Sequence, residues 1–248
     1  MFDHVTLRAS DVEASERFYR TVLPLVGAGA PDRDDDGFPD WGELSLYPAE
    51  TPDAVTRRLH LGLVAPSREV VDAFWQTGVD AGYASDGEPG PRPQYVDDYY
   101  GAFLLDPDGN SVEAMLYTGA RQNGWIDHLW IRVADVAASR AFYELAAPFG
   151  GFHLEGGREG RATFSPGDGR GSFSLTPATD DWPATENLHI AFPGTRELVD
   201  GFWEALVREG GYRDHGAPGE RPQYHPGYYG AFVLDPDGNN VEVVHHAR

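Results

Sequence analysis

The segment RPQYVDDYYGAFLLDPDGNSVE at 92–113 returns with few changes as RPQYHPGYYGAFVLDPDGNNVE at 221–242. A second pair, DHVTLRASDVEASERFY at 3–19 and DHLWIRVADVAASRAFY at 127–143, repeats in the same order. Self-similarity at a fixed spacing indicates a duplicated structural unit. The stretch TGARQNG at 118–124 joins the copies and is short, polar and broken by two glycines. We therefore predict two domains, at residues 1–120 and 125–248.

Each copy has the same predicted order of elements: a strand, a helix and further strands, twice per half. Alternating apolar residues indicate the strands, and apolar residues at helical spacing indicate the helices. Asp11 or Ser10, Asp135, Ser67 and Thr195 are the expected helix starts. Each copy should end in a hairpin, because DPDGN has the Pro, Asp and Gly of a tight turn. The predicted strands are Phe2–Arg8, Gly42–Tyr47, Arg58–Val64, Tyr100–Leu105 and Ser111–Tyr117, then Trp125–Val133, Gly171–Thr176, Asn187–Phe192, Tyr229–Leu234 and Asn240–His245.

Composition restricts the partners. Acidic residues number 40 and basic residues 19, for a formal charge of −21, so the average field of the protein repels nucleic acid and anionic membrane surfaces. No stretch approaches 18 consecutive apolar residues, and MFDHVTLRAS lacks the pattern of a signal peptide. We expect a cytoplasmic protein with a small-molecule substrate, as a monomer or a homodimer. Without cysteine, any metal must be bound by imidazole, carboxylate or water.

Each copy carries a histidine at the start of its first strand, a histidine on its third strand and a glutamate on its last strand. These residues are His4, His60 and Glu113 in the first copy and His128, His189 and Glu242 in the second. Strand alternation places all six on the face away from the aliphatic side chains and the helices. An ionised glutamate in a cavity on that face costs several kcal/mol unless it is paired or binds a cation. Two imidazoles and one carboxylate suit Fe²⁺ best, and related sites hold Ni²⁺, Zn²⁺, Mn²⁺ or Co²⁺.

The combination resembles the vicinal oxygen chelate superfamily, which includes glyoxalase I, extradiol dioxygenases and bleomycin-binding proteins. The most specific part is the repeated segment that ends in DPDGN-x-VE, with two histidines before it. The resemblance covers nearly the whole chain. It implies an α+β fold of tandem glyoxalase-like domains, in which paired βαβββ modules form half-barrel sheets around a metal cleft.

The resemblance leaves two groupings of the six ligands open, because some family members build the cleft within one half and others exchange modules between halves. The first grouping is His4/His60/Glu113 with His128/His189/Glu242. The second is His4/His189/Glu242 with His128/His60/Glu113.

Differences between the copies bear on the reaction type. Glu43 resembles the additional carboxylate ligand of glyoxalase I, and the second copy has Ser172 there. His225 lies near the place of the acid/base histidine of extradiol dioxygenases, where the first copy has Val96. The tyrosine expected ten residues before the glutamate is phenylalanine in both copies. The nearest substitute catalytic tyrosines are Tyr100 and Tyr229.

The remaining histidines follow no repeated pattern, and two of them, His245 and His246, are interpreted as tail residues.

Two classes of function follow from these features. The first is a metal-dependent enzyme whose substrate chelates the ion through two neighbouring oxygens, either as a dioxygenase or as a glyoxalase-like lyase or isomerase. The three-ligand set beside His225 favours the dioxygenase, and Glu43 favours the lyase or isomerase. The second class is a metal-free resistance protein that sequesters a drug or metabolite between the halves, as bleomycin-binding relatives do. Repeated ligand residues argue against that class, which does not require them.

Overall fold

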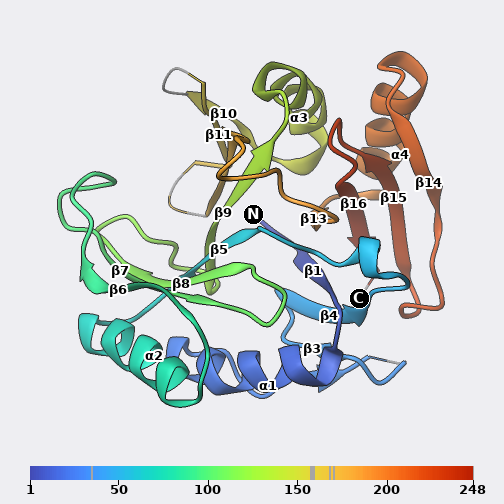
Figure 1. The fold of residues 1–248 in the computed structure, drawn as a ribbon. Coiled ribbons are helices and arrows are strands. Elements are labelled where there is room, and N and C mark those ends of the chain that lie inside the picture. The colour runs from blue at the N-terminus through green and yellow to red at the C-terminus, as the bar shows by residue number, and fades with distance from the viewer. Residues whose placement is uncertain (35, 157–159, 168, 170, 248) are drawn as a thin grey trace.

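The computed structural model describes residues 1–248 except 35, 157–159, 168, 170 and 248. Four βαβββ modules follow one another along the chain (Figure 1). Module 1 contains β1 (His4–Ala9), α1 (Val12–Val22), β2 (Asp32–Arg33), β3 (Pro39–Asp40) and β4 (Leu44–Pro48). Module 2 contains β5 (His60–Val64), α2 (Arg68–Asp80), β6 (Ser85–Pro91), β7 (Tyr100–Leu105) and β8 (Ser111–Leu116). The predicted α+β fold of paired βαβββ modules is confirmed.

The second half repeats this order. Module 3 contains β9 (Ile126–Val133), α3 (Val136–Gly150), β10 (His153–Gly156), β11 (Ala162–Ser165) and β12 (Ser172–Pro177). Module 4 contains β13 (His189–Pro193), α4 (Arg196–Trp203), β14 (Arg213–Glu220), β15 (Tyr228–Leu234) and β16 (Asn240–His246). Short helical turns lie at Leu23–Val26, Pro52–Ala54 and Glu204–Glu209.

All four helices begin where polar caps predict. The side chains of Asp11, Ser67, Asp135 and Thr195 each accept a hydrogen bond from a backbone N–H in the first turn. Sequence patterning missed the second strand of each module. It also missed the short strands β3 in module 1 and β11 in module 3. Strands β6 and β14 are rich in glycine and proline and lie at sheet edges, where proline costs no ladder hydrogen bond.

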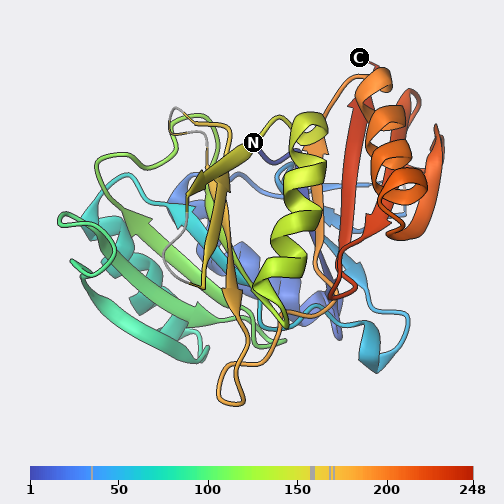
Figure 2. The same cartoon turned by 90° about the horizontal axis from the view of Figure 1, so that it is seen from above.

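The two eight-stranded sheets each combine one module from each half of the chain. One sheet has the order β14-β15-β16-β13-β1-β4-β3-β2, so it joins module 4 to module 1. The other has the order β10-β11-β12-β9-β5-β8-β7-β6 and joins module 3 to module 2. The modules meet through antiparallel pairs, β1 with β13 and β5 with β9. Seen from above, β15 and β16 lie far from β6 and β7, with α3 between them (Figure 2).

Within a half, the two modules are fastened through helices and the DPDGN turn. Helix α1 packs against α2, and α3 packs against α4. The Tyr19 hydroxyl donates to Asp106 over 3.0 Å, and Tyr143 donates to Asp235 over 3.2 Å. Both repeated segments therefore have a structural role, because the tyrosine of one binds the first aspartate of the other.

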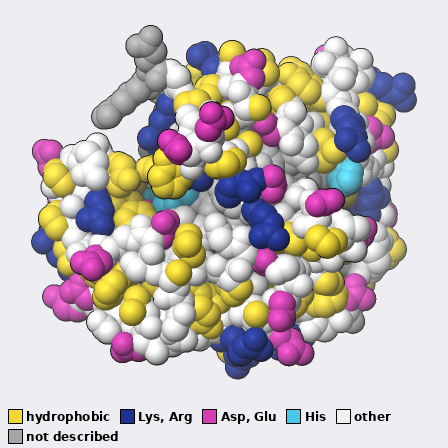
Figure 3. Space-filling view, viewed as in Figure 1, with side chains coloured by type: hydrophobic (Ala, Val, Ile, Leu, Met, Phe, Trp, Pro, Cys, Tyr) yellow, Lys and Arg dark blue, Asp and Glu magenta, His cyan; other side chains and the backbone are white. Residues whose placement is uncertain are grey.

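Charged side chains of both signs are interspersed over the face drawn in Figure 3. Among the described residues, no helix is long and apolar enough to span a membrane.

Candidate metal centres

Each sheet brings two histidines and one glutamate together. His4, His189 and Glu242 form one cluster, called here the open triad, and His60, Glu113 and His128 form the other, called the closed triad. In each triad the ligand atoms lie within 4.8 Å of one another. These are the exchanged groupings, and the groupings within one half do not form clusters. The reason is the sheet order, which places β1 beside β13 and β9 beside β5.

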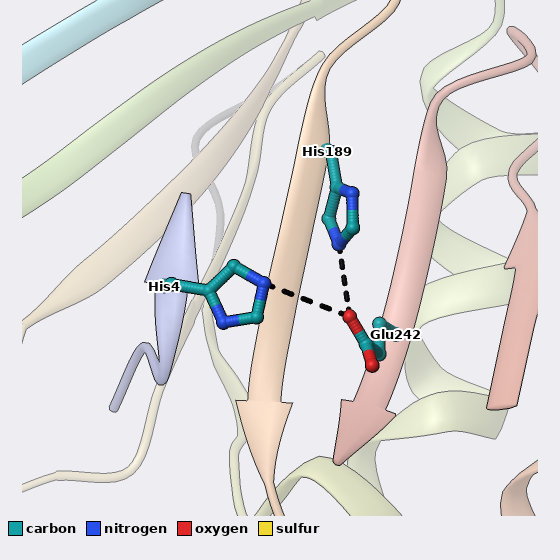
Figure 4. Close-up of side chains that lie close together, drawn as sticks. All are labelled: His4, His189 and Glu242. Carbon is teal, nitrogen blue, oxygen red and sulfur yellow. Dashed lines mark hydrogen bonds and ion pairs between the residues drawn. The ribbon is translucent and has the colours of Figure 1, made fainter. Parts of the chain in front are cut away.

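The open triad has its donor atoms directed at one point (Figure 4). Nε2 of His189 lies 3.0 Å from Oε2 of Glu242, and Nε2 of His4 lies 3.6 Å from the same oxygen. Nδ1 of His4 donates to Asp3 over 2.9 Å. Because this hydrogen bond occupies Nδ1, Nε2 faces the glutamate and offers its lone pair to a metal once its proton is lost, as in the carboxylate–histidine pairs of metal sites.

His189 has an adjustable partner on its other ring nitrogen. The amide nitrogen of Asn240 lies 3.2 Å from Nδ1 of His189, while the amide oxygen of Asn240 is buried without a hydrogen-bond partner among the described residues. Turning this amide by half a revolution would let its oxygen accept from Nδ1–H. Nε2 of His189 would then be unprotonated, as metal binding requires. The orphaned oxygen thus fits a site that accommodates a cation.

A tyrosine hydroxyl holds the second oxygen of each triad glutamate. Tyr228 donates to Oε1 of Glu242 over 2.6 Å, and Tyr99 donates to Oε1 of Glu113 over 2.9 Å. Sequence patterning instead chose their neighbours, Tyr100 and Tyr229. Alternation could have found the correct pair, because Tyr99 lies on the same strand face as Phe103, which pairs with Glu113.

The two triads differ in access. The histidine side chains of the closed triad are 6% and 8% exposed, against 18% and 16% in the open triad. Trp130 pairs with His60 across the strands and covers its ring at 4.9 Å, with Arg161 over the tryptophan at 4.7 Å. In the open triad, the residue that pairs with His189 is Thr6. A small side chain therefore leaves open the position that an indole fills in the closed triad.

One glycine also draws the closed triad together. Gly62 pairs with His128, and a Cβ at Gly62 would lie 2.3 Å from that imidazole ring. At the matching place in the open triad, Ala191 pairs with His4. Without a methyl group beneath it, the His128 ring lies with Nε2 only 3.3 Å from Nε2 of His60.

Gly62→Ala is expected to destabilise the protein by about 2 kcal/mol, because the added methyl group overpacks the closed triad. Urea unfolding measures the change. Metal binding at the open triad should not change, because Gly62 has no contact with it. The matched control, Ala191→Gly, should cost about 1 kcal/mol through backbone entropy and should leave the closed triad unchanged. An unchanged stability for Gly62→Ala would show that the His128 ring is free to move away.

Hydrogen bonds set the charge of the first-strand histidines. Burial lowers the pKa of His128, but its hydrogen bonds to Asp127 and Glu113 outweigh burial and raise the pKa to about 9. The pKa of His4 is raised in the same way, against burial, by Asp3. Burial lowers the pKa of the other histidine of each triad, His60 on β5 and His189 on β13. In the closed triad, the imidazolium of His128 therefore balances the Glu113 carboxylate inside the protein.

A cavity of about 310 Å³ opens beside the open triad. His4 and His189 reach its wall, and Tyr228 and His225 lie on the same wall. The other lining side chains include Thr6, Arg8, Asp34, Asp36, Asp40, Tyr47 and Tyr224. The second cavity lies on the far side of Trp130 and is lined by no residue of the closed triad. Of these two cavities, the one beside the open triad thus offers coordination positions to a small molecule.

Glu43 does not join either triad, which corrects the prediction that it is a fourth metal ligand. Its Oε1 accepts from Arg121 over 2.6 Å. Its Oε2 accepts from the backbone N–H groups of Trp125 and Ile126 over 2.9 and 3.0 Å. Both carboxylate oxygens are therefore engaged, one by the segment that joins the two halves and the other by the residues that follow it, so Glu43 is part of a structural clamp.

The two tyrosines predicted to be catalytic point away from the triads. The hydroxyls of Tyr100 and Tyr229 donate to Asp72 and Asp200, on helices α2 and α4, over 2.8 and 2.7 Å. Their strand face is the one that the helices cover, so they do not reach the ligand atoms. This corrects their assignment.

His225 does line the cavity of the open triad. His246, interpreted from sequence as a tail residue, is instead the end of strand β16 and lines the same cavity.

Known proteins share sequence features and the fold with this chain. The model of the Glyoxalase/Bleomycin resistance protein/Dioxygenase superfamily matches residues 1–114 and again 125–243. Glyoxalase I from Zea mays is similar in structure, with 20% identity, coverage of 99% of this chain and 92% of that chain, and a TM-score of 0.70. A dioxygenase-like protein from Bacillus subtilis is 11% identical, with coverage of 100% and 85% and a TM-score of 0.65. A search of curated proteins gives no match.

The chain belongs to the Glyoxalase/Bleomycin resistance protein/Dioxygenase superfamily, and the resemblance seen in the sequence is confirmed. At these identities, the solved structures show a shared fold of tandem domains. The domain limits 1–120 and 125–248 stay a prediction.

Proposed function

We propose that this protein is a metal-dependent enzyme with one reaction centre, the open triad, and that its substrate is a small molecule with two neighbouring oxygens. The observation that carries the proposal is the convergence on a buried glutamate of two histidines that line a cavity of about 310 Å³. Glu242 is fully buried, so its charge needs a counter-charge. A divalent cation between Nε2 of His4, Nε2 of His189 and Oε2 of Glu242 would supply it.

The donor set favours Fe²⁺ and a dioxygenase-like reaction. With Glu43 engaged elsewhere, three protein ligands remain, which is the facial arrangement typical of non-haem Fe(II) oxygenases. Bound iron would supply Lewis acidity and one-electron chemistry with O₂. Tyr228 orients Glu242 through its 2.6 Å hydrogen bond. His225 on the cavity wall would exchange a proton with a substrate hydroxyl.

A lyase or isomerase reaction is the second candidate, and Asp40 favours it. Asp40 lines the cavity, and burial raises the pKa of its carboxyl group above the ordinary value. A carboxylate of raised pKa is suited to move a proton between neighbouring carbons of a chelated substrate.

A substitution that fills the cavity tests the proposed centre. Thr6→Trp copies the tryptophan of the closed triad and should weaken binding of 4-nitrocatechol, a chromophoric probe with two adjacent oxygens, at least tenfold, while the bound metal remains. Absorbance titration of the anaerobic, iron-loaded protein measures the dissociation constant. Trp130→Thr is the matched control and should leave probe binding unchanged.

The outcomes separate the candidate functions. Uptake of O₂ with a bound catechol supports the dioxygenase. If the probe binds but the protein consumes no O₂ with any substrate tested, the lyase or isomerase is favoured. Equal probe binding to metal-free and metal-loaded protein would favour the sequestering protein.

A further inference from the structure

The side chain of Asn240 sets which nitrogen of His189 carries hydrogen. Asn240 pairs with His189 across β16 and β13, and its amide nitrogen lies 3.2 Å from Nδ1 of the imidazole. An amide nitrogen only donates, so Nδ1 is an acceptor and the hydrogen of the ring is on Nε2. Nε2 then donates to Oε2 of Glu242 over 3.0 Å (Figure 4). Burial lowers the pKa of His189, in agreement with a neutral ring.

The opposite orientation of this amide is unfavourable without a cation. With the amide oxygen toward His189, Nδ1 would donate and Nε2 would be an acceptor. Nε2 and the carboxylate oxygen of Glu242 would then face each other as two acceptors, 3.0 Å apart. A cation between them removes this repulsion, because both atoms become ligands. The metal-free and the metal-bound centre thus require opposite orientations of one amide group.

The other end of the amide is placed to allow this exchange. Oδ1 of Asn240 is buried and has no hydrogen-bond partner among the described residues. No interaction of this oxygen is therefore lost when the amide turns, and the oxygen gains a donor in the Nδ1–H group of His189. A buried acceptor without a donor is unfavourable, so the turned amide also removes that cost for the oxygen.

The closed triad has a different group at this position, and its histidine is fixed. Ser111 is the repeat equivalent of Asn240, and its hydroxyl donates to Asp86 over 2.7 Å. With its only hydrogen engaged, Oγ of Ser111 accepts from Nδ1 of His60, 3.3 Å away. In the open half His215 stands at the position of Asp86, so no carboxylate at that position fixes the orientation of Asn240.

We propose that Asn240 is a positioning residue of the metal centre and that its amide turns when the cation binds. This inference deepens the proposed function and rests on it. The hydrogen on Nε2 of His189 leaves to water, and a hydrogen from water arrives at Nδ1, so the ring stays neutral. The Asn240 oxygen accepts from Nδ1–H, and the lone pair of Nε2 is available to the cation. Asn240 is not among the residues that line the cavity, so this role is separate from substrate binding.

Zinc affinity and nitrogen-15 NMR of the histidine side chains test the inference on the full chain. In the metal-free native chain, the hydrogen of His189 should be on Nε2, and Zn²⁺ should move it to Nδ1. Asn240→Asp replaces the amide with a pure acceptor, so Nδ1 of His189 should carry hydrogen before zinc is added. The same variant should bind Zn²⁺ about tenfold more tightly, the lower end of the effect of a group that orients a metal-bound histidine.

Further variants separate positioning from packing. Asn240→Leu keeps the approximate size of the side chain without a donor or an acceptor, and should weaken Zn²⁺ binding about tenfold. Asn240→Ser restores a group that both donates and accepts, and should keep the zinc affinity within about threefold of the native value. Ser111→Asn makes the converse change at the closed triad, and should leave the zinc affinity and the number of bound ions unchanged.

The results separate this inference from the metal centre itself. Hydrogen on Nδ1 of His189 in the metal-free native chain, or a zinc affinity of Asn240→Asp no higher than that of the native chain, would overturn the role of Asn240. Absence of any zinc-induced change in the ring nitrogens of His4 and His189 would instead overturn the metal centre.

Discussion

Glu242→Gln is expected to abolish metal binding at the open triad and to lower metal-dependent activity at least a thousandfold. The amide keeps the size of the side chain but removes the one negative charge among the three ligands, and neutral amides are poor partners for Fe²⁺ in such a set. Metal analysis of anaerobically purified, tag-free protein measures the loss. The native chain should carry one ion and the variant none.

Glu113→Gln is the matched control for this prediction. It makes the same change in the closed triad, where His128 already balances the carboxylate and Trp130 covers the rings. Its metal content should equal that of the native chain. Loss of metal from Glu113→Gln but not from Glu242→Gln would assign the ion to the closed triad and contradict the proposed centre.

Glu43→Ala is expected to lower the free energy of unfolding by about 3 kcal/mol without changing metal content. Arg121 is only 5% exposed, so the substitution leaves a buried guanidinium without its carboxylate. It also leaves the N–H groups of Trp125 and Ile126 without their acceptor. Urea unfolding and metal analysis of the same preparation measure the two effects.

Glu50→Ala serves as the control, because Glu50 is exposed and its loss should change stability by less than about 0.5 kcal/mol. If Glu43→Ala instead kept its stability and lost metal, Glu43 would be a ligand after all and the clamp would be secondary.

Sequence patterning found the six triad residues because it needed only strand alternation and repetition. The side chains of His4, His60 and Glu113 oppose aliphatic neighbours along single strands, so local pattern assigns their face. The partner of each histidine could not be predicted, because it depends on which module edges pair. That pairing arises from packing of whole modules, and no short segment encodes it.

The errors in the predicted site also have physical causes. Glu43 immediately precedes β4, a strand of the sheet that carries the open triad. Its neighbours in the sequence give no sign of Arg121, which is 78 residues away. Tyr100 was preferred to Tyr99 for its place relative to the family pattern, although alternation places Tyr99 on the face of the glutamate. His246 lies on the face of Glu242 by the same alternation, and its position near the end of the sequence concealed this.

The difference in exposure between the two triads could not be predicted without the register of the strand pairs β1–β13 and β5–β9. Thr6 and Trp130 occupy equivalent places in the repeat, but their effect depends on the histidine that each opposes. Ala191 and Gly62 add a second difference of the same kind. The open centre thus has threonine in place of tryptophan at one position and alanine in place of glycine at the other, and these two differences distinguish it from the sealed one.

The central claim is that one metal centre is built between the first and the fourth module, and anomalous X-ray diffraction from Mn²⁺-soaked crystals tests it most directly. The account predicts one strong peak, within bonding distance of Nε2 of His4, Nε2 of His189 and the carboxylate of Glu242. A peak between His60, Glu113 and His128 with none at the open triad would contradict it.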